Sequence, residues 1–172
     1  MRKPLGALSL VVLAGCGYHA RFPLPAHIKT FNVETFRNKT LERNLDFEFT
    51  QALIHEVLGK TRLRVARPGE GDLVVRGEIE ELERHVLHSR RYGEKVEMRH
   101  LLYVNVEMFD RQKGRMFFQG KRIVRRAEFS LNRGETPRLA REELVRELAR
   151  RVVSLAFERW PTQPAEATAR AQ

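Results

Sequence analysis

Apolar and charged side chains alternate along two segments in the middle of this chain, and this period limits the folds that the chain can adopt. In residues 73–80 every second position is apolar or glycine, and residues 102–108 repeat the pattern. Successive side chains of a β-strand point to opposite faces, so each segment is predicted to form a strand with one buried face. Residues 90–94 are expected to form the tip of a long hairpin, and residues 112–114 the turn of a second one.

Helical periodicity flanks these strands. Apolar residues recur at spacings of three and four through residues 45–58, and Gly59 follows as an end signal. After Pro137, which suits a first helical turn, a second apolar stripe comprises Leu144, Leu148, Val152, Leu155 and Trp160. With short strands at 28–33 and 62–65, this order predicts the α+β class. We expect a two-layer sandwich in which a mainly antiparallel sheet of about four strands carries two helices on one face.

The N-terminus has the order of a bacterial lipoprotein signal peptide. A basic start precedes a short apolar run that ends in Leu13-Ala14-Gly15-Cys16. That run is about half of the ~20 residues needed to span a membrane, so it is predicted to be cleaved rather than to anchor the chain as a helix. Cys16, the single cysteine, would then become the acylated first residue. Gly17 at the next position favours sorting to the outer membrane.

These features divide the chain into four parts. Residues 1–15 are expected to be the signal peptide and residues 16–26 an acylated tether. Residues 27–160 are expected to form a single α+β domain, and residues 161–172, rich in Pro, Ala, Thr and Gln, a flexible tail. We therefore expect a lipid-anchored protein on the periplasmic face of the outer membrane.

The net charge of +10 is unevenly distributed. Residues 84–126 hold twelve Lys and Arg against four Asp and Glu, whereas residues 16–83 and 127–172 are nearly neutral. Charges of mixed sign would protect a sheet edge equally well, so a surplus of one sign favours an anionic partner. Arg also offers a planar fork that matches phosphate. The basic candidate binding residues are Arg90, Arg91, Lys121, Arg122, Arg125 and Arg126.

The last four of these residues lie in one predicted strand, residues 116–129. Alternation places Lys121 and Arg125 on one face of that strand and Arg122 and Arg126 on the other. Adjacent phenylalanines put apolar side chains on both faces, which predicts a bulge or two-sided packing. The pattern therefore does not name the inner face.

The expected compartment decides among anionic partners. Tyr103, Phe117 and Phe118 do not form an RNA-binding strand motif, so nucleic acid is not expected. Behind a lipoprotein signal peptide, the available anions are phospholipid head groups and lipopolysaccharide. Divalent cations bridge the phosphates of lipopolysaccharide, and clustered Arg and Lys can replace those cations.

The residues with catalytic or metal-binding potential form no recognisable motif. The six histidines include no HExxH pattern, and His85 and His88 are predicted to point to opposite faces of a strand. We expect no catalytic residues, no metal, no cofactor and no enzymatic activity.

An ordered series of short segments resembles the LptE family of lipopolysaccharide-assembly lipoproteins. The segments are 13–19 (LAGCGYH), 24–25 (LP), 27–33 (HIKTFNV), 36–40 (FRNKT), 50–53 (TQAL) and 72–79 (DLVVRGEI). The resemblance implies the family's small two-layer fold and a non-catalytic role. It also implies a plug inside the outer-membrane barrel LptD, assistance in the assembly of that barrel, and binding of lipopolysaccharide.

A second hypothesis stays open from the residues alone. The chain could be a lipoprotein adaptor of another envelope assembly, such as a secretion or barrel-assembly complex, whose basic strands bind an acidic protein. Copurification from solubilised outer membrane distinguishes the two hypotheses by the partner recovered.

Overall fold

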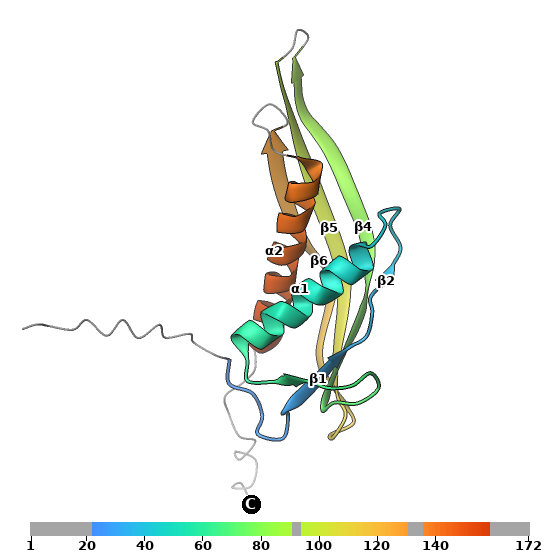
Figure 1. Cartoon of the computed structure of the whole chain (residues 1–172), viewed down its shortest axis with the longest axis vertical. Coiled ribbons are helices and arrows are strands. Elements are labelled where there is room, and N and C mark those ends of the chain that lie inside the picture. The colour runs from blue at the N-terminus through green and yellow to red at the C-terminus, as the bar shows by residue number, and fades with distance from the viewer. Residues whose placement is uncertain (1–21, 91–93, 131–135, 159–172) are drawn as a thin grey trace, which may run out of the picture.

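The computed structural model describes residues 22–90, 94–130 and 136–158 (Figure 1). The expected signal peptide, Cys16, Arg91, Trp160 and the tail lie outside these residues. The described elements follow the order β1 (Thr30–Val33), β2 (Arg37–Asn38), α1 (Leu45–Lys60), β3 (Arg64–Val65), β4 (Leu73–Arg90), β5 (Glu94–Asp110), β6 (Arg115–Ser130) and α2 (Pro137–Phe157).

Three long strands form the predicted antiparallel part of the sheet. β4 pairs with β5 and β5 with β6, and both hairpin connections fall where the sequence places them. At one end the hairpin of β4 and β5 continues past the helices and past β6 (Figure 1). The alternation fits this arrangement because one face of the three strands is buried and the other is not.

The sheet is larger and more mixed than the sequence predicts. Its order is β3-β1-β4-β5-β6, and β2 also pairs with β4, which makes six described strands instead of about four. β1 runs parallel to both β3 and β4, and β2 runs parallel to β4. β3 falls within the short strand predicted at residues 62–65, whereas β2 has two residues, too few to show a period. The parallel direction of β1 follows from α1, which lies between β1 and β4 in the chain and provides the crossover that parallel neighbours need.

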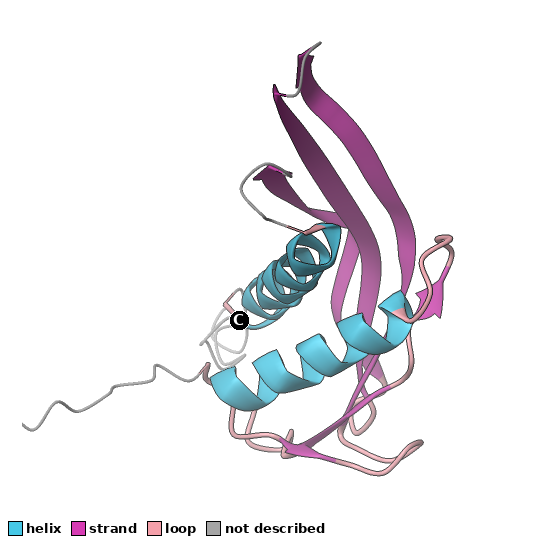
Figure 2. Cartoon of the chain, turned by 45° about the horizontal axis from the view of Figure 1, so that its top comes forward, coloured by secondary structure: helices cyan, strands magenta, loops and turns pink. Residues whose placement is uncertain are grey.

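Both helices lie on one face of the sheet, as predicted (Figure 2). α1 buries Leu45, Phe49, Leu53 and Val57 at helical spacing. The C-terminal stripe likewise buries Leu144, Leu148 and Val152, which have no exposed surface. The core therefore lies between this helical layer and the inner face of the sheet, and we call the opposite, helix-free side the outer face.

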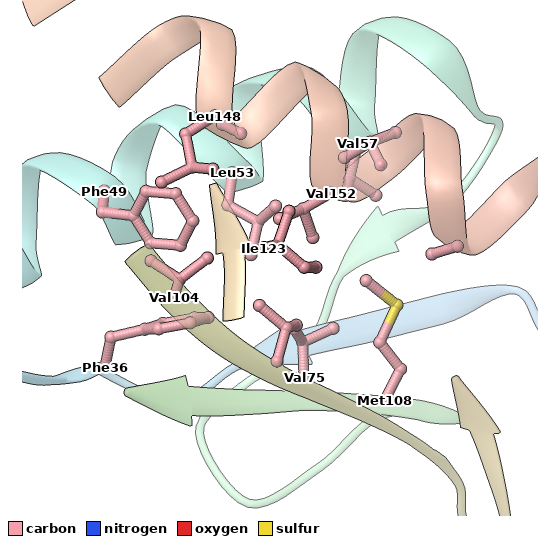
Figure 3. Close-up of a cluster of buried hydrophobic side chains, with 14 of the residues drawn as sticks. Phe36, Phe49, Leu53, Val57, Val75, Val104, Met108, Ile123, Leu148 and Val152 are labelled. Carbon is pink, nitrogen blue, oxygen red and sulfur yellow. The ribbon is translucent and has the colours of Figure 1, made fainter. Parts of the chain in front are cut away.

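Side chains from α1, α2 and the sheet meet in the core (Figure 3). Leu148 and Val152 of α2 and Leu53 of α1 lie above Val104 and Ile123 of the sheet. The side chain of Phe36, which follows β1, packs edge-on against Phe49 of α1 with ring centroids 4.9 Å apart. Burial of these large side chains stabilises each element only in the presence of the others.

A glycine permits the close approach of Phe36 to the sheet. A β-carbon at Gly77 would lie 2.1 Å from the backbone oxygen of Asn105 and 2.6 Å from the ring of Phe36. No side chain fits in that space, so position 77 of β4 requires glycine for packing.

Candidate functional site

A bulge in β6 sets the direction of its basic side chains. The register of β5 and β6 shifts by one residue here, so that Lys121 and Arg122 both lie opposite Asn105. Arg122 adopts a φ of 47°, in the left-handed region that non-glycine residues seldom occupy. Its N–H donates a hydrogen bond to Oδ1 of Asn105 at 2.7 Å. The side chain of the neighbouring strand therefore stabilises the bulge.

Because of the bulge, the predicted division of the basic side chains between the two faces of β6 is only partly correct. Arg125 pairs with the buried Leu102 and lies half-buried on the helix-covered face. Arg122 and Arg126 share the outer face, as alternation predicts. Lys121 also lies on the outer face, so the prediction that it shares a face with Arg125 is wrong. The buried side chains of Ile123 and Phe129 identify the inner face that the sequence pattern does not name.

Glutamates neutralise part of the basic surplus on the outer face. The guanidinium of Arg122 lies 2.6 Å from Oε1 of Glu80 and 3.7 Å from Oε2 of Glu81, both on β4. A further cross-strand ion pair neutralises Arg99, which lies 2.9 Å from Glu128 of β6. Exposed pairs of this kind contribute about 0–1 kcal/mol each. The surplus counted along residues 84–126 therefore overstates the positive field, because some of its cations face acids from outside that segment.

Arg122 is also held by an aromatic ring. Its Cζ lies 4.5 Å from the ring centroid of Tyr103, a cation–π distance. The hydrogen bond to Glu80 raises the pKa of Arg122. Within the described residues, Lys121 and Arg126 have no acidic group within 4.0 Å. Of the candidate basic residues of β6 that the structure describes, these two are therefore the exposed cations on this face that are free to meet an external anion.

A cavity of about 570 Å³ opens beside Lys121. Its charged lining residues are Glu34, Arg37, Arg76, Glu78, Glu107 and Lys121. Equal numbers of cations and carboxylates line it, so its formal charge is balanced.

The backbone of Arg90, the hairpin arginine that the structure describes, is remote from this surface. Arg90 ends β4 opposite Glu94, the first residue of β5, whereas Lys121 lies opposite Asn105. At about 3.4 Å per residue, these two levels of β5 are roughly 35 Å apart. The structure therefore does not bring Arg90 together with the basic side chains of β6.

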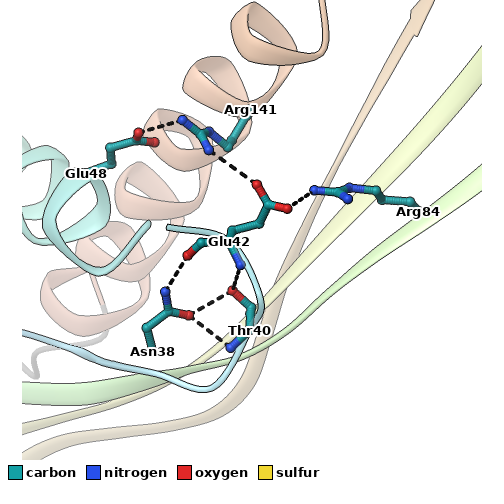
Figure 4. A network of polar contacts seen from close by, with 6 residues as sticks. All are labelled: Asn38, Thr40, Glu42, Glu48, Arg84 and Arg141. Atoms are coloured by element: carbon teal, nitrogen blue, oxygen red, sulfur yellow. Dashed lines mark hydrogen bonds and ion pairs between the residues drawn. The ribbon is translucent and has the colours of Figure 1, made fainter. Parts of the chain in front are cut away.

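A polar network on the inner side of the sheet, which the sequence does not signal, fixes the chain before α1 (Figure 4). Asn38 donates to the backbone oxygen of Glu42 at 2.7 Å and accepts from the N–H of Thr40 at 2.9 Å. The carboxylate of Glu42 pairs with Arg84 of β4 and, at 3.4 Å, with Arg141 of α2. The hydrogen bond from Arg84 lowers the pKa of Glu42, so this carboxylate is charged near neutral pH.

The described residues contain no group of three or more His, Cys, Asp or Glu side chains arranged to hold a metal ion. Within the same part of the chain, neither helix is both long enough and apolar enough to cross a bilayer.

The fold defines a small two-layer α+β domain, and charged side chains lie on the outer face of its sheet. A family model described as LptE, lipopolysaccharide-assembly, matches residues 28–156. The chain therefore belongs to the LptE family, which confirms the resemblance found in its sequence.

Solved structures with a comparable arrangement are only distantly similar. A minor lipoprotein from Acinetobacter baumannii is 15% identical with a TM-score of 0.49, covering 81% of this chain and 100% of its own. The PelC dodecamer from Paraburkholderia phytofirmans is 14% identical with a TM-score of 0.48, covering 80% of this chain and 94% of its own. No curated protein sequence matches this chain.

Proposed function

We propose that this protein is a lipid-anchored outer-membrane subunit of the lipopolysaccharide export complex. It plugs an LptD-like barrel and assists its assembly, and it binds lipopolysaccharide through basic side chains of β6 during export. Membership of a lipopolysaccharide-assembly family supports the process. The lipobox ending in Cys16 supports the anchor.

The observation that supports the ligand is the pair of β6 cations on the outer face that have no ion-pair partner among the described residues. Lys121 and Arg126 are exposed and have no ion-pair partner among the described residues, whereas the neighbouring Arg122 is held by Glu80. Lipopolysaccharide presents clustered phosphates, and an unpaired Lys or Arg meets a phosphate without first breaking an internal pair. Binding and exchange of this kind require no catalytic residue.

The test compares outer-face and inner-face cations of the same strand. Replacing Lys121 and Arg126 together with Gln is expected to weaken binding of purified protein to lipopolysaccharide by about tenfold at low salt, since two exposed charge contacts are removed. The matched control, Arg125→Gln, removes a cation of the same strand, next to Arg126 and four residues from Lys121, that points to the helix side, and should leave the affinity unchanged. Wild-type binding should weaken as salt rises, because the Debye length is about 8 Å at physiological ionic strength.

Equal affinity of the outer double variant and wild type at low salt would exclude this surface as the lipopolysaccharide site. Copurification from solubilised outer membrane tests the partner separately. Recovery of an LptD-like barrel supports the proposal. Recovery of secretion components alone would favour an adaptor of another envelope assembly.

A further inference from the structure

A second cavity lies on the helix-covered side of the sheet, near the start of α2. It measures about 500 Å³, within the range of roughly 300–1,000 Å³ that is usual for small-molecule sites. The loop before α1, strands β4 and β5, and the first turns of α2 enclose it. Its polar lining residues are Glu42, Arg84, His100, Arg138 and Arg141.

Positive charge predominates in this lining. Three guanidinium groups line the cavity against one carboxylate, and Arg84 and Arg141 share that carboxylate, Glu42. The other carboxylate that pairs with Arg141, Glu48 at 2.7 Å, does not line the cavity. Arg138 pairs at 2.9 Å with Glu142, one helical turn further along α2, and its side chain is 73% exposed.

Two polar groups of this cavity are buried without partners. His100 is 3% exposed, and neither of its ring nitrogens has a hydrogen-bond partner among the described residues. The buried Nε of Arg141 likewise has no acceptor in the part of the chain that the structure describes. A buried donor without an acceptor is unfavourable, so both groups indicate that an acceptor belongs in this space.

The N-terminus of α2 adds to the positive potential. Pro137 begins the helix, and the side chain of Thr136 accepts a hydrogen bond from the N–H of Leu139 at 3.3 Å. The first turn contains no acidic residue and carries Arg138 instead. Helix N-termini favour anions, so this end of α2 adds to the positive potential beside the cavity.

We propose that this cavity binds a phosphomonoester, with Arg84, Arg138 and Arg141 around the phosphate and the ring N–H of His100 as a further donor. A dianionic phosphate offers several acceptors to the three guanidinium forks. Of the three carboxylates that pair with these arginines, Glu42, Glu48 and Glu142, only Glu42 lines the cavity. The site lies on the opposite side of the sheet from Lys121 and Arg126 and is separate from the surface proposed above to bind lipopolysaccharide.

The test uses the full chain in maltoside detergent with labelled histidine rings. Inorganic phosphate is titrated at constant ionic strength, with acetate as the competing carboxylate, and the ring signal of His100 is followed by NMR. We expect a saturable shift with phosphate, a much weaker response to acetate, and a rise in the pKa of His100 on binding. The other charged groups facing this ring are Arg84 of β4 and Glu42 of the loop, with Arg138 and Arg141 of α2 across the cavity.

Two arginines of the same helix provide matched variants. Arg138→Gln should weaken phosphate binding by about tenfold, since it removes one charged hydrogen-bonding fork. Arg150→Gln removes an arginine that is also exposed and also pairs within α2, with Glu147, but does not line the cavity, and it should leave binding unchanged. Both positions are exposed, so both variants should keep the wild-type melting temperature.

A short-chain phosphatidic acid, added below its critical micelle concentration, shows whether the phosphate belongs to a lipid head group or to a soluble phosphate ester. Tighter binding than inorganic phosphate would assign the site to a lipid head group, and equal or weaker binding would assign it to a soluble phosphate ester. Absence of a saturable His100 shift with either probe, or equal loss in the two variants, would overturn the proposal.

Discussion

The carboxylate of Asp72 accepts two hydrogen bonds from Thr30, one from its N–H and one from its hydroxyl, both at 2.9 Å. The N–H of Lys29 donates to the same oxygen at 2.9 Å, and the side-chain amide of Gln112 donates to the other oxygen at 2.8 Å. Asp72 thus connects the start of β4 to its parallel neighbour β1 and to the turn between β5 and β6.

These contacts predict that the stabilisation provided by Asp72 is lost at acidic pH. The hydrogen bond from the N–H of Lys29 is the largest cause that lowers the pKa of Asp72, to about 2. A carboxyl with a lowered pKa stabilises the fold at pH values above its unfolded pKa of about 3.9, and this stabilisation is lost as the pH falls through about 2. Asp72→Ala should cost roughly 1–3 kcal/mol near neutral pH, because it leaves backbone donors without an acceptor.

Melting curves of wild type and Asp72→Ala between pH 2 and pH 7 test this expectation. The difference between their melting temperatures should be largest above about pH 4 and should shrink toward pH 2. A difference that stays constant over the whole range would show that the charge of Asp72 has no role.

The second prediction concerns the packing of α2. Leu148 has no exposed surface and lies at the centre of the core, so Leu148→Asp would bury a charge without a partner. Truncation of a buried Leu alone costs about 2–5 kcal/mol, and the charge adds to that cost. The variant should melt far below wild type, whereas Arg146→Asp, at an exposed position of the same helix, should not. Similar melting temperatures for the two variants would contradict the assignment of the layers.

Alanine substitutions at two glycines test whether the close packing of β4 against β5 and Phe36 requires glycine at position 77. Gly77→Ala is expected to destabilise the domain, since the new methyl group would meet the backbone of β5 at 2.1 Å. Gly59→Ala, near the end of α1, meets nothing within 4 Å and should stabilise it by about 0.5–1 kcal/mol through helix propensity. Denaturant unfolding measures both, and an unchanged or raised stability of Gly77→Ala would refute the packing argument.

The anchor is tested by metabolic labelling with a fatty acid. Cys16→Ala should abolish incorporation and leave the precursor uncleaved, because the predicted acceptor thiol is gone. Equal label in wild type and variant would show that Cys16 is not the acceptor.

Elements with a clear period and a single buried face could be predicted from the sequence. The alternation in β4 and β5 and the stripes of α1 and α2 follow directly from which side chains each element buries. The short strand predicted at residues 62–65 contains β3, but the sequence could not reveal β2, because two residues show no period. The parallel direction of β1 was likewise hidden, since strand direction depends on how the chain connects the strands rather than on their side chains.

The arrangement of charge was less predictable than the charge itself. The basic content of β6 is evident in the sequence, but Glu80 lies 42 residues from Arg122, and only the strand pairing brings them together. The row of glutamates in residues 78–83, next to a predicted hairpin, was the available signal. The bulge at Lys121 depends on Asn105 from the neighbouring strand, so no local pattern within β6 could assign its faces.

The mixed sheet has a consequence for the order of folding. β4, β5 and β6 are connected by short turns, so each pairing closes only a small loop, whereas Phe31 of β1 must find Leu73 of β4 across the whole of α1. Closing the longer loop costs more chain entropy and slows formation of that contact. We therefore expect the N-terminal strands, although synthesised first, to join the sheet last, and this end of the domain to exchange its amide hydrogens sooner than the meander of long strands.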